Sequence, residues 1–151
     1  MKTYCIRTGV MFNDDGTQLF DGCYAGGFKG TVPEAINDPD YCSVKNTGPI
    51  PPGVYTIGEP YQNPNTGSHT MNLTPDESNE MFGRGDFRCH GDNPAMNRSA
   101  SDGCIIRSPA NIRCQIYTQG EKRLTVVREA EDVQGVYSPA PAPIVAQNAQ
   151  D

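Results

Sequence analysis

The sequence predicts a small, mostly β domain with little helix, followed by a flexible tail. Glycine and proline supply 16 and 13 of the 151 residues, and so many chain breakers argue against long helices. Short stretches with a period of two are separated by turn residues instead. The length fits one domain, which we place at residues 1–131, because the Pro/Ala/Gln-rich segment 132–151 has no periodicity.

Strands are expected where polar and apolar residues alternate between turns. Six stretches fit this description: residues 3–12, 17–26, 54–58, 68–75, 86–91 and 122–129. An Asn-Asp-Asp-Gly turn separates the first two, and these residues tolerate positive φ, so we predict a hairpin that sets Cys5 opposite Cys23. Residues 26–48 are expected to form a loop with at most one helical turn.

One or two short helices are expected from local capping chemistry. Thr74 and Pro75 provide an N-cap and a first helical position for a turn over residues 74–83. Ser108 and Pro109 provide the same pair after a strand or turn that begins at Cys104. Both predicted helices are short, so the domain stays mostly β.

Charge and hydropathy exclude some classes of function. The net charge is −6, and the basic residues are scattered rather than interleaved with aromatics in a stripe, which argues against nucleic-acid binding. No stretch approaches the roughly 20 apolar residues of a membrane helix. The first residues lack a continuous apolar run, so no classical signal peptide is visible. We expect synthesis in the cytoplasm, with export by another route left open.

The chain has six cysteines, an even number that fits up to three disulfides. The same count also fits one reactive thiol among buried ones. The cysteines lie at positions 5, 23, 42, 89, 104 and 114.

The stretch FRCHGDNPAMNRSASDGCIIR, residues 87–107, holds the best candidate for a chemical site. His90 ends a predicted strand and Cys104 opens the next element, so the two ends can converge although fourteen positions separate them. A nucleophilic thiol needs a base and donors for an oxyanion. Gly103 lets a substrate approach the backbone, and N–H groups near Gly103 and Cys104 would serve as those donors.

Two other interpretations of this stretch stay open on the residues alone. His90 and Cys104 are equally compatible with a hydrogen-bonded structural histidine and a buried or disulfide-bonded cysteine. A zinc site from Cys89, His90, Cys104 and Cys114 is weaker, because there is no Cys-x-x-Cys pair and adjacent strand residues face apart. We therefore expect no metal and no cofactor.

Three segments occur in an order that resembles a known family. They are TGPIPPGVYTIGEP at 47–60, LTPDESNEMFGRGDFRCHGDN at 73–93 and SASDGCII at 99–106. Together they resemble the type VI secretion L,D-transpeptidase effectors, a branch of the YkuD-like L,D-transpeptidase superfamily, over roughly residues 4–128. The resemblance implies a small β-sandwich or barrel-like domain.

The resemblance also implies roles for single residues. Cys104 would be the nucleophile and His90 its base, while Ser101 and Gly103 would shape the turn and nearby amides would hold the oxyanion. The implied substrate is the tetrapeptide stem of peptidoglycan, cut at the L-centre of meso-diaminopimelate with release of D-alanine. Transfer of the acyl group to an amine is transpeptidation, and transfer to water is carboxypeptidation; the sequence does not separate them.

An enzyme of this kind would be an antibacterial secreted effector that acts in the periplasm of a target bacterium. Its partners would be the secretion machinery and an immunity protein. The sequence leaves two alternatives: a phage-encoded lysis enzyme, and a disulfide-stabilised domain that binds wall peptides without catalysis.

The chain departs from the superfamily pattern S-H-G-C-x-R at two positions. Asp102 stands where that pattern has histidine, and Arg107 lies three rather than two places after the cysteine. Arg107 remains a candidate to pair with a substrate carboxylate. Cys89 stands beside the presumed base, and we expect it to pair with Cys114.

Four further residues lie near the site in the sequence, and the sequence suggests more than one role for some of them. Asp92 either orients His90 or binds a substrate amine, or it simply forms a turn. His69 either lines the substrate cleft or, as we favour, is a half-exposed surface residue. Arg84 and Arg88 are expected to be solvated charges.

Overall fold

The computed structural model of the chain describes residues 1–133. The predicted tail lies outside the described residues from residue 134 onward, and Asp132 still belongs to a short 3-10 turn, η3 (Ala130–Asp132). No helix in the described part is long and apolar enough to cross a membrane.

The mostly β prediction is confirmed. The strands within residues 1–133 are β1 (Lys2–Cys5), β2 (Val10–Phe12), β3 (Gln18–Phe20), β4 (Tyr24–Ala25), β5 (Gly53–Ile57), β6 (Tyr61–Asn63), β7 (Gly67–Pro75), β8 (Arg88–His90), β9 (Ile105–Ile106) and β10 (Arg123–Val127). The helical elements there are α1 (Ala110–Arg113), α2 (Gln115–Thr118), η1 (Pro33–Ala35), η2 (Pro39–Tyr41) and η3.

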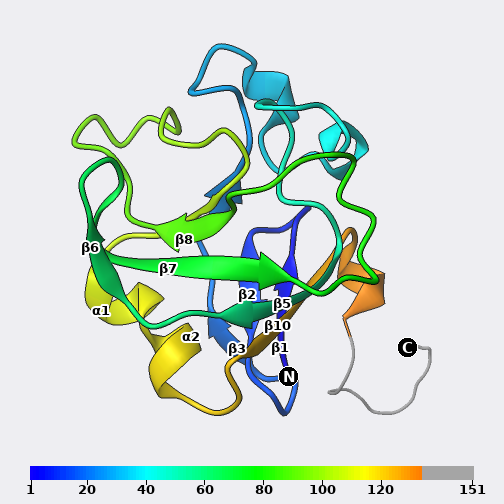
Figure 1. Cartoon of the computed structure of the whole chain (residues 1–151), viewed down its shortest axis with the longest axis vertical. Coiled ribbons are helices and arrows are strands. Elements are labelled where there is room, and N and C mark those ends of the chain that lie inside the picture. The colour runs from blue at the N-terminus through cyan, green and yellow to red at the C-terminus, as the bar shows by residue number, and fades with distance from the viewer. Residues whose placement is uncertain (134–151) are drawn as a thin grey trace.

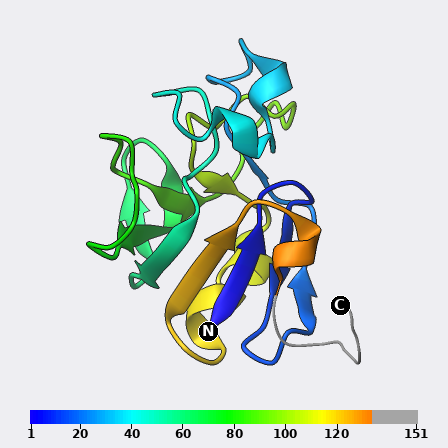
Figure 2. The ribbon, with the colours of Figure 1, turned by 90° about the vertical axis from the view of Figure 1, so that its right-hand side faces the viewer.

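The strands form one connected mixed sheet in the order β3-β2-β1-β10-β5-β7-β8-β9-β4, with β6 paired to β7. The pairs β1–β10 and β8–β9 are parallel. Figure 1 shows the long strand β7 crossing the molecule, and Figure 2 shows β1 (dark blue) and β10 (dark orange) side by side. Phe20 of β3 and Ile105 of β9 share one buried cluster although their strands lie near opposite ends of this order. The sheet therefore curves around its core.

The first predicted strand divides into β1 and β2 at a turn. Gly9 has φ +69°, and a Cβ there would lie 2.2 Å from the carbonyl oxygen of Cys23, so the chain reverses at a residue without a side chain. Cys5 consequently lies opposite Val10, and the predicted pairing of Cys5 with Cys23 is wrong. The hairpin across residues 13–17 is confirmed as β2–β3.

The two helix predictions have different outcomes. Thr74 and Pro75 do not start a helix, because both stay in β7 and pair with β5. The second helix forms as α1, followed at once by α2, but its N-cap is Pro109 and no side chain caps it. Local capping signals alone therefore located one helix of two, since strand pairing outweighs them at residues 74 and 75.

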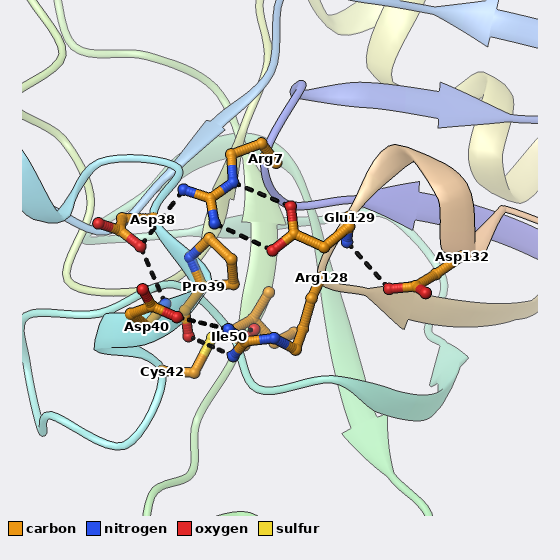
Figure 3. Close-up of polar contacts among 9 residues, drawn as sticks. All are labelled: Arg7, Asp38, Pro39, Asp40, Cys42, Ile50, Arg128, Glu129 and Asp132. Carbon is orange, nitrogen blue, oxygen red and sulfur yellow. Dashed lines mark hydrogen bonds and ion pairs between the residues drawn. The ribbon is translucent and has the colours of Figure 1, made fainter.

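A cluster of ion pairs fastens η2 to the ends of β1 and β10 (Figure 3). Arg7 pairs with Asp38, the N-cap of η2, at 3.6 Å. It also donates to both carboxylate oxygens of Glu129 at 3.0 and 2.9 Å. Arg128 donates to the Pro39 carbonyl at 2.9 Å and pairs with the Asp40 carboxylate. These contacts hold η2, and the segment after it reaches the turn before Cys104, where the Ile50 N–H donates to the Gly103 carbonyl at 2.9 Å.

All six cysteines are free in the structure. Cys5, Cys23, Cys42 and Cys89 are buried, whereas Cys104 and Cys114 are partly exposed. The expected Cys89–Cys114 disulfide is therefore wrong. The fold is held by its core and its hydrogen bonds rather than by cross-links.

Candidate active site

A cavity of about 940 Å³ opens at the carboxyl end of β8. His90 and Cys104 both line it, so the structure brings the two predicted residues to one site. The segment 83–88 and the loop after β8 form much of the wall. A volume of this size lies at the upper end of ordinary small-molecule sites.

The register of β8 and β9 decides which side chains face the cavity. Cys89 pairs with Ile105 and His90 with Ile106 in the parallel ladder, and paired residues of neighbouring strands point to the same side. Cys89 and Ile105 are fully buried in the hydrophobic core. His90 takes the opposite face, as predicted for adjacent strand residues, which also explains why Cys89 lies beside the site without joining it.

His90 is held as a neutral base. Its Nδ1 lies 2.9 Å from the Gly91 carbonyl oxygen, and since a carbonyl only accepts, Nδ1 carries the proton and Nε2 keeps its lone pair. Burial lowers the pKa of His90, and the nearby Arg113 and Arg88 charges add to this against the Gly91 hydrogen bond. Nε2 of the ring is therefore able to accept a proton.

The Cys104 thiol receives one backbone hydrogen bond. The Arg88 N–H donates to Cys104 Sγ at 3.3 Å. Burial raises the pKa of the Cys104 thiol, and the Arg88 amide and charge oppose that rise. The raised pKa of the Cys104 thiol and the lowered pKa of the His90 imidazole both favour the neutral forms of these groups.

The Ser101 hydroxyl stabilises the turn that carries Cys104 through three hydrogen bonds. It donates to the Cys104 carbonyl at 2.7 Å and accepts from the N–H groups of Gly26 and Gly103, each at 2.9 Å. The Gly103 N–H is thus already used and does not serve as the expected oxyanion donor. Among the described residues none accepts a hydrogen bond from the Cys104 N–H, which makes it the remaining candidate.

Gly103 is required by space as well as by backbone geometry. Its φ is +150°, and a Cβ there would lie 2.7 Å from Arg84 Nη2, 2.8 Å from Phe87 Cε1 and 3.0 Å from the Gly48 carbonyl oxygen. The first two distances are shorter than real Cβ contacts, and the third is unusually tight, so only glycine fits directly before the thiol.

Arg84 is the residue that sequence reasoning missed. The expectation of a solvated charge is wrong, because Arg84 is only 9% exposed and stacks over the Phe87 ring at 5.0 Å. Its guanidinium donates to four backbone carbonyls, those of Cys42, Gly48, Pro49 and Asp102. It joins the loop after η2 to the turn before Cys104. Nothing in the run Gly-Arg-Gly signals these long-range partners.

Asp92 and Asp102 line the cavity but neither orients His90. Asp92 Oδ1 accepts from the Tyr24 hydroxyl at 2.7 Å and from the Asn93 N–H at 2.9 Å, so it anchors the loop after β8. The Asp102 carboxylate lies 4.0 Å from Lys29 Nζ, and its Oδ1 is buried without a partner.

Arg107 and His69 do not reach the cavity. Arg107 comes directly after Ile106, and its side chain is not among those that line the cavity. It donates to the carbonyls of Asp21 and Ser108 and stacks over Phe20. Its proposed pairing with a substrate carboxylate therefore lacks a geometric basis. His69 is exposed, as favoured from the sequence, and contributes only its carbonyl, which accepts from Arg113.

Within residues 1–133 no cluster of three or more His, Cys, Asp or Glu side chains is arranged to hold a metal ion. The cavity is instead lined by a thiol and an oriented imidazole, and the N–H of Cys104 has no acceptor among the described residues. This set can carry out nucleophilic acyl transfer.

Comparison with known proteins gives one match. A family model described as the Tlde1 domain matches residues 25–130, more than half of the chain and all of the candidate site. No curated protein and no solved structure matches the chain.

Proposed function

Since the chain belongs to the Tlde1 domain family of type VI secretion L,D-transpeptidase effectors, we propose that it is a cysteine L,D-carboxypeptidase or transpeptidase acting on peptidoglycan tetrapeptide stems. The observation that carries the proposal is the shared cavity of Cys104 and His90, with His90 Nδ1 bonded to the Gly91 carbonyl. That bond leaves Nε2 to act on the thiol.

The acylation step begins with transfer of the Cys104 proton to His90 Nε2. The thiolate then attacks the carbonyl carbon of the L-centre of meso-diaminopimelate, and the Cys104 N–H receives the oxyanion. When the tetrahedral intermediate collapses, the imidazolium gives its proton to the leaving nitrogen of D-alanine. A thioester joins the remaining tripeptide to Cys104.

Deacylation returns the enzyme to its resting state. His90 Nε2 takes a proton from water or from an acceptor amine, which attacks the thioester carbonyl, and the thiol regains that proton. Water yields a free tripeptide, and an amine yields a cross-link or an exchanged D-amino acid. The cavity of about 940 Å³ supports both outcomes, because it has room for an acceptor beside the stem.

Membership of the family supports a proposal for where this activity takes place. An effector of the type VI system reaches the wall of a target cell, so we place the action of this protein in the periplasm of that cell. The producing cell then needs an immunity protein against the enzyme.

Incubation with purified tetrapeptide muropeptides, followed by mass spectrometry of the products, tests the proposal. We expect loss of D-alanine with the wild type and none with Cys104→Ala. Cys114→Ala is the matched control, since Cys114 is also partly exposed but lies outside the cavity; it should retain activity. Identical products from wild type and Cys104→Ala would sink the enzymatic interpretation.

A further inference from the structure

Arg88 is a cation in direct backbone contact with Cys104. It begins β8, its N–H donates to Cys104 Sγ at 3.3 Å, and it lines the cavity. Because residues 88 and 90 of a strand share a face, the Arg88 side chain leaves the backbone on the same side as His90. A ligand in contact with the thiol therefore lies within reach of this side chain.

The Arg88 charge has no anionic partner in the protein. No carboxylate within residues 1–133 forms an ion pair with it. One Nη donates to the Asp86 carbonyl at 3.2 Å, and Nε is buried without a hydrogen-bond partner. The Tyr61 hydroxyl beside it raises the pKa of Arg88, so the group stays cationic.

Two other arginines near the site donate hydrogen bonds to several backbone carbonyls, which Arg88 does not. Arg84 donates to four carbonyls, and Arg113 donates to three, those of Ser68, His69 and Arg107. A partly buried cation that lacks such partners is costly unless an anion joins it. Guanidinium groups favour carboxylates, which they bind through two parallel hydrogen bonds.

We propose that Arg88 binds the C-terminal carboxylate of the amino acid that the enzyme releases. This inference rests on the proposed function and names its substrate class: stems that end in a free carboxylate. In such a stem the terminal carboxylate is separated from the scissile carbonyl carbon by only the amide nitrogen and one Cα. It is therefore the substrate carboxylate that lies next to Cys104 Sγ during attack.

The kinetic signature of this role is a binding effect. The terminal carboxylate keeps its charge throughout the reaction, so Arg88 stabilises the bound substrate and the transition state alike. Loss of such an interaction raises KM and leaves kcat nearly unchanged. A residue that only supported the fold would not single out the charge at the end of the substrate.

The test compares two synthetic tetrapeptide stems that differ only at the end, one with a free terminal carboxylate and one with a carboxamide. We expect the wild type to prefer the acid in kcat/KM by on the order of 100-fold. Arg88→Gln should lose most of that preference through KM, and Arg88→Lys should keep part of it. Arg123→Gln, which removes an arginine that pairs with Asp76 away from the cavity, should behave as the wild type.

A third stem, amidated only on the side-chain carboxylate of its diaminopimelate, tests which carboxylate is bound. Arg88→Gln should affect this stem and the unmodified stem alike. If Arg88→Gln instead removes a preference for the side-chain carboxylate, or keeps the full preference for the terminal acid, the assignment is overturned. Thermal unfolding of each variant shows whether the fold is intact.

Equilibrium binding to the Cys104→Ala protein separates this inference from the proposed function. If that protein binds the acid more tightly than the amide, and Arg88→Gln in the same background abolishes the difference, the subsite stands even where no turnover occurs. If turnover occurs and Arg88→Gln keeps the preference for the terminal acid, the proposed role of Arg88 is wrong, while the proposed enzymatic function is supported. If the acid and the amide bind equally, the subsite is wrong.

Discussion

At the scale of single residues, the partners of a charge decide its role. Arg84 and Arg88 lie four positions apart and both line the cavity, yet Arg84 gives its hydrogen bonds to the protein and Arg88 keeps an unpartnered Nε. Arg84 is thus a positioning residue for the turn before Cys104, the proposed nucleophile. Replacing Arg84 would leave buried carbonyls without hydrogen-bond donors, which lowers the stability of the folded protein.

Arg84→Met should destabilise the protein by about 3–5 kcal/mol, since it orphans carbonyl oxygens that only the guanidinium reaches. Denaturant unfolding followed by circular dichroism measures this. Arg123→Met removes an exposed ion pair with Asp76 and should change the free energy of unfolding far less. Equal effects of the two variants would contradict the positioning role.

The pH dependence of kcat/KM should report on His90. Burial lowers the pKa of His90, so the neutral base persists below its ordinary pKa of about 6.5. Activity should rise with pH and reach half its plateau below that value, with the midpoint belonging to the coupled thiol–imidazole pair. A midpoint above about 6.5 would contradict a His90 base whose pKa is lowered by burial.

At the scale of elements, the geometry of the parallel pair β8–β9 directs the side chains of two adjacent residues to opposite faces of the sheet. Cys89 enters the core and His90 enters the cavity because their strand alternates. The turn ahead of β9 then has to bring Cys104 to the same face. It does so through Gly103, whose surroundings leave no room for a side chain.

Gly103→Ala should therefore abolish activity and lower stability, with about 1–3 kcal/mol from backbone strain alone. Gly85→Ala is the matched control, because Gly85 also lines the cavity but a Cβ there meets nothing within 4 Å. The two variants are compared by kcat/KM and by denaturant unfolding. An active, stable Gly103→Ala protein would show that the turn is less constrained than the contacts imply.

At the scale of the whole molecule, the sheet curves around one core, and three arginines fasten η2 and the loop after it. Arg7 pairs with Asp38 and Arg128 donates to Pro39, which holds η2 (Figure 3), and Arg84 holds the loop after it. The turn before Cys104 is thereby tied to this loop by Arg84 without a disulfide among the described residues.

The sequence predicted the parts of this account that depend on local pattern. Strand alternation placed β5, β7, β8 and β10, and it separated Cys89 from His90. It did not predict the break at Gly9, the burial of Arg84 or the turning away of Arg107, because each depends on a partner far along the chain. Spacing in a sequence carries no information about such contacts.

Stability should not depend on the redox state of the solution. All six cysteines are free, so a reductant such as tris(2-carboxyethyl)phosphine should leave Tm unchanged. Thiol counting in denaturant without reductant should return six. A disulfide normally contributes about 2–4 kcal/mol, so a clear fall in Tm on reduction would favour the disulfide-stabilised binding domain.

The central claim is that Cys104 carries the acyl group. Rapid acid quenching of the enzyme with tetrapeptide muropeptide, followed by intact-mass and peptide mass spectrometry, tests it most directly. We predict an adduct equal to the stem without its D-alanine, located on Cys104 and absent from Cys104→Ala. Turnover with the adduct on another residue, or full turnover by Cys104→Ala, would contradict the account.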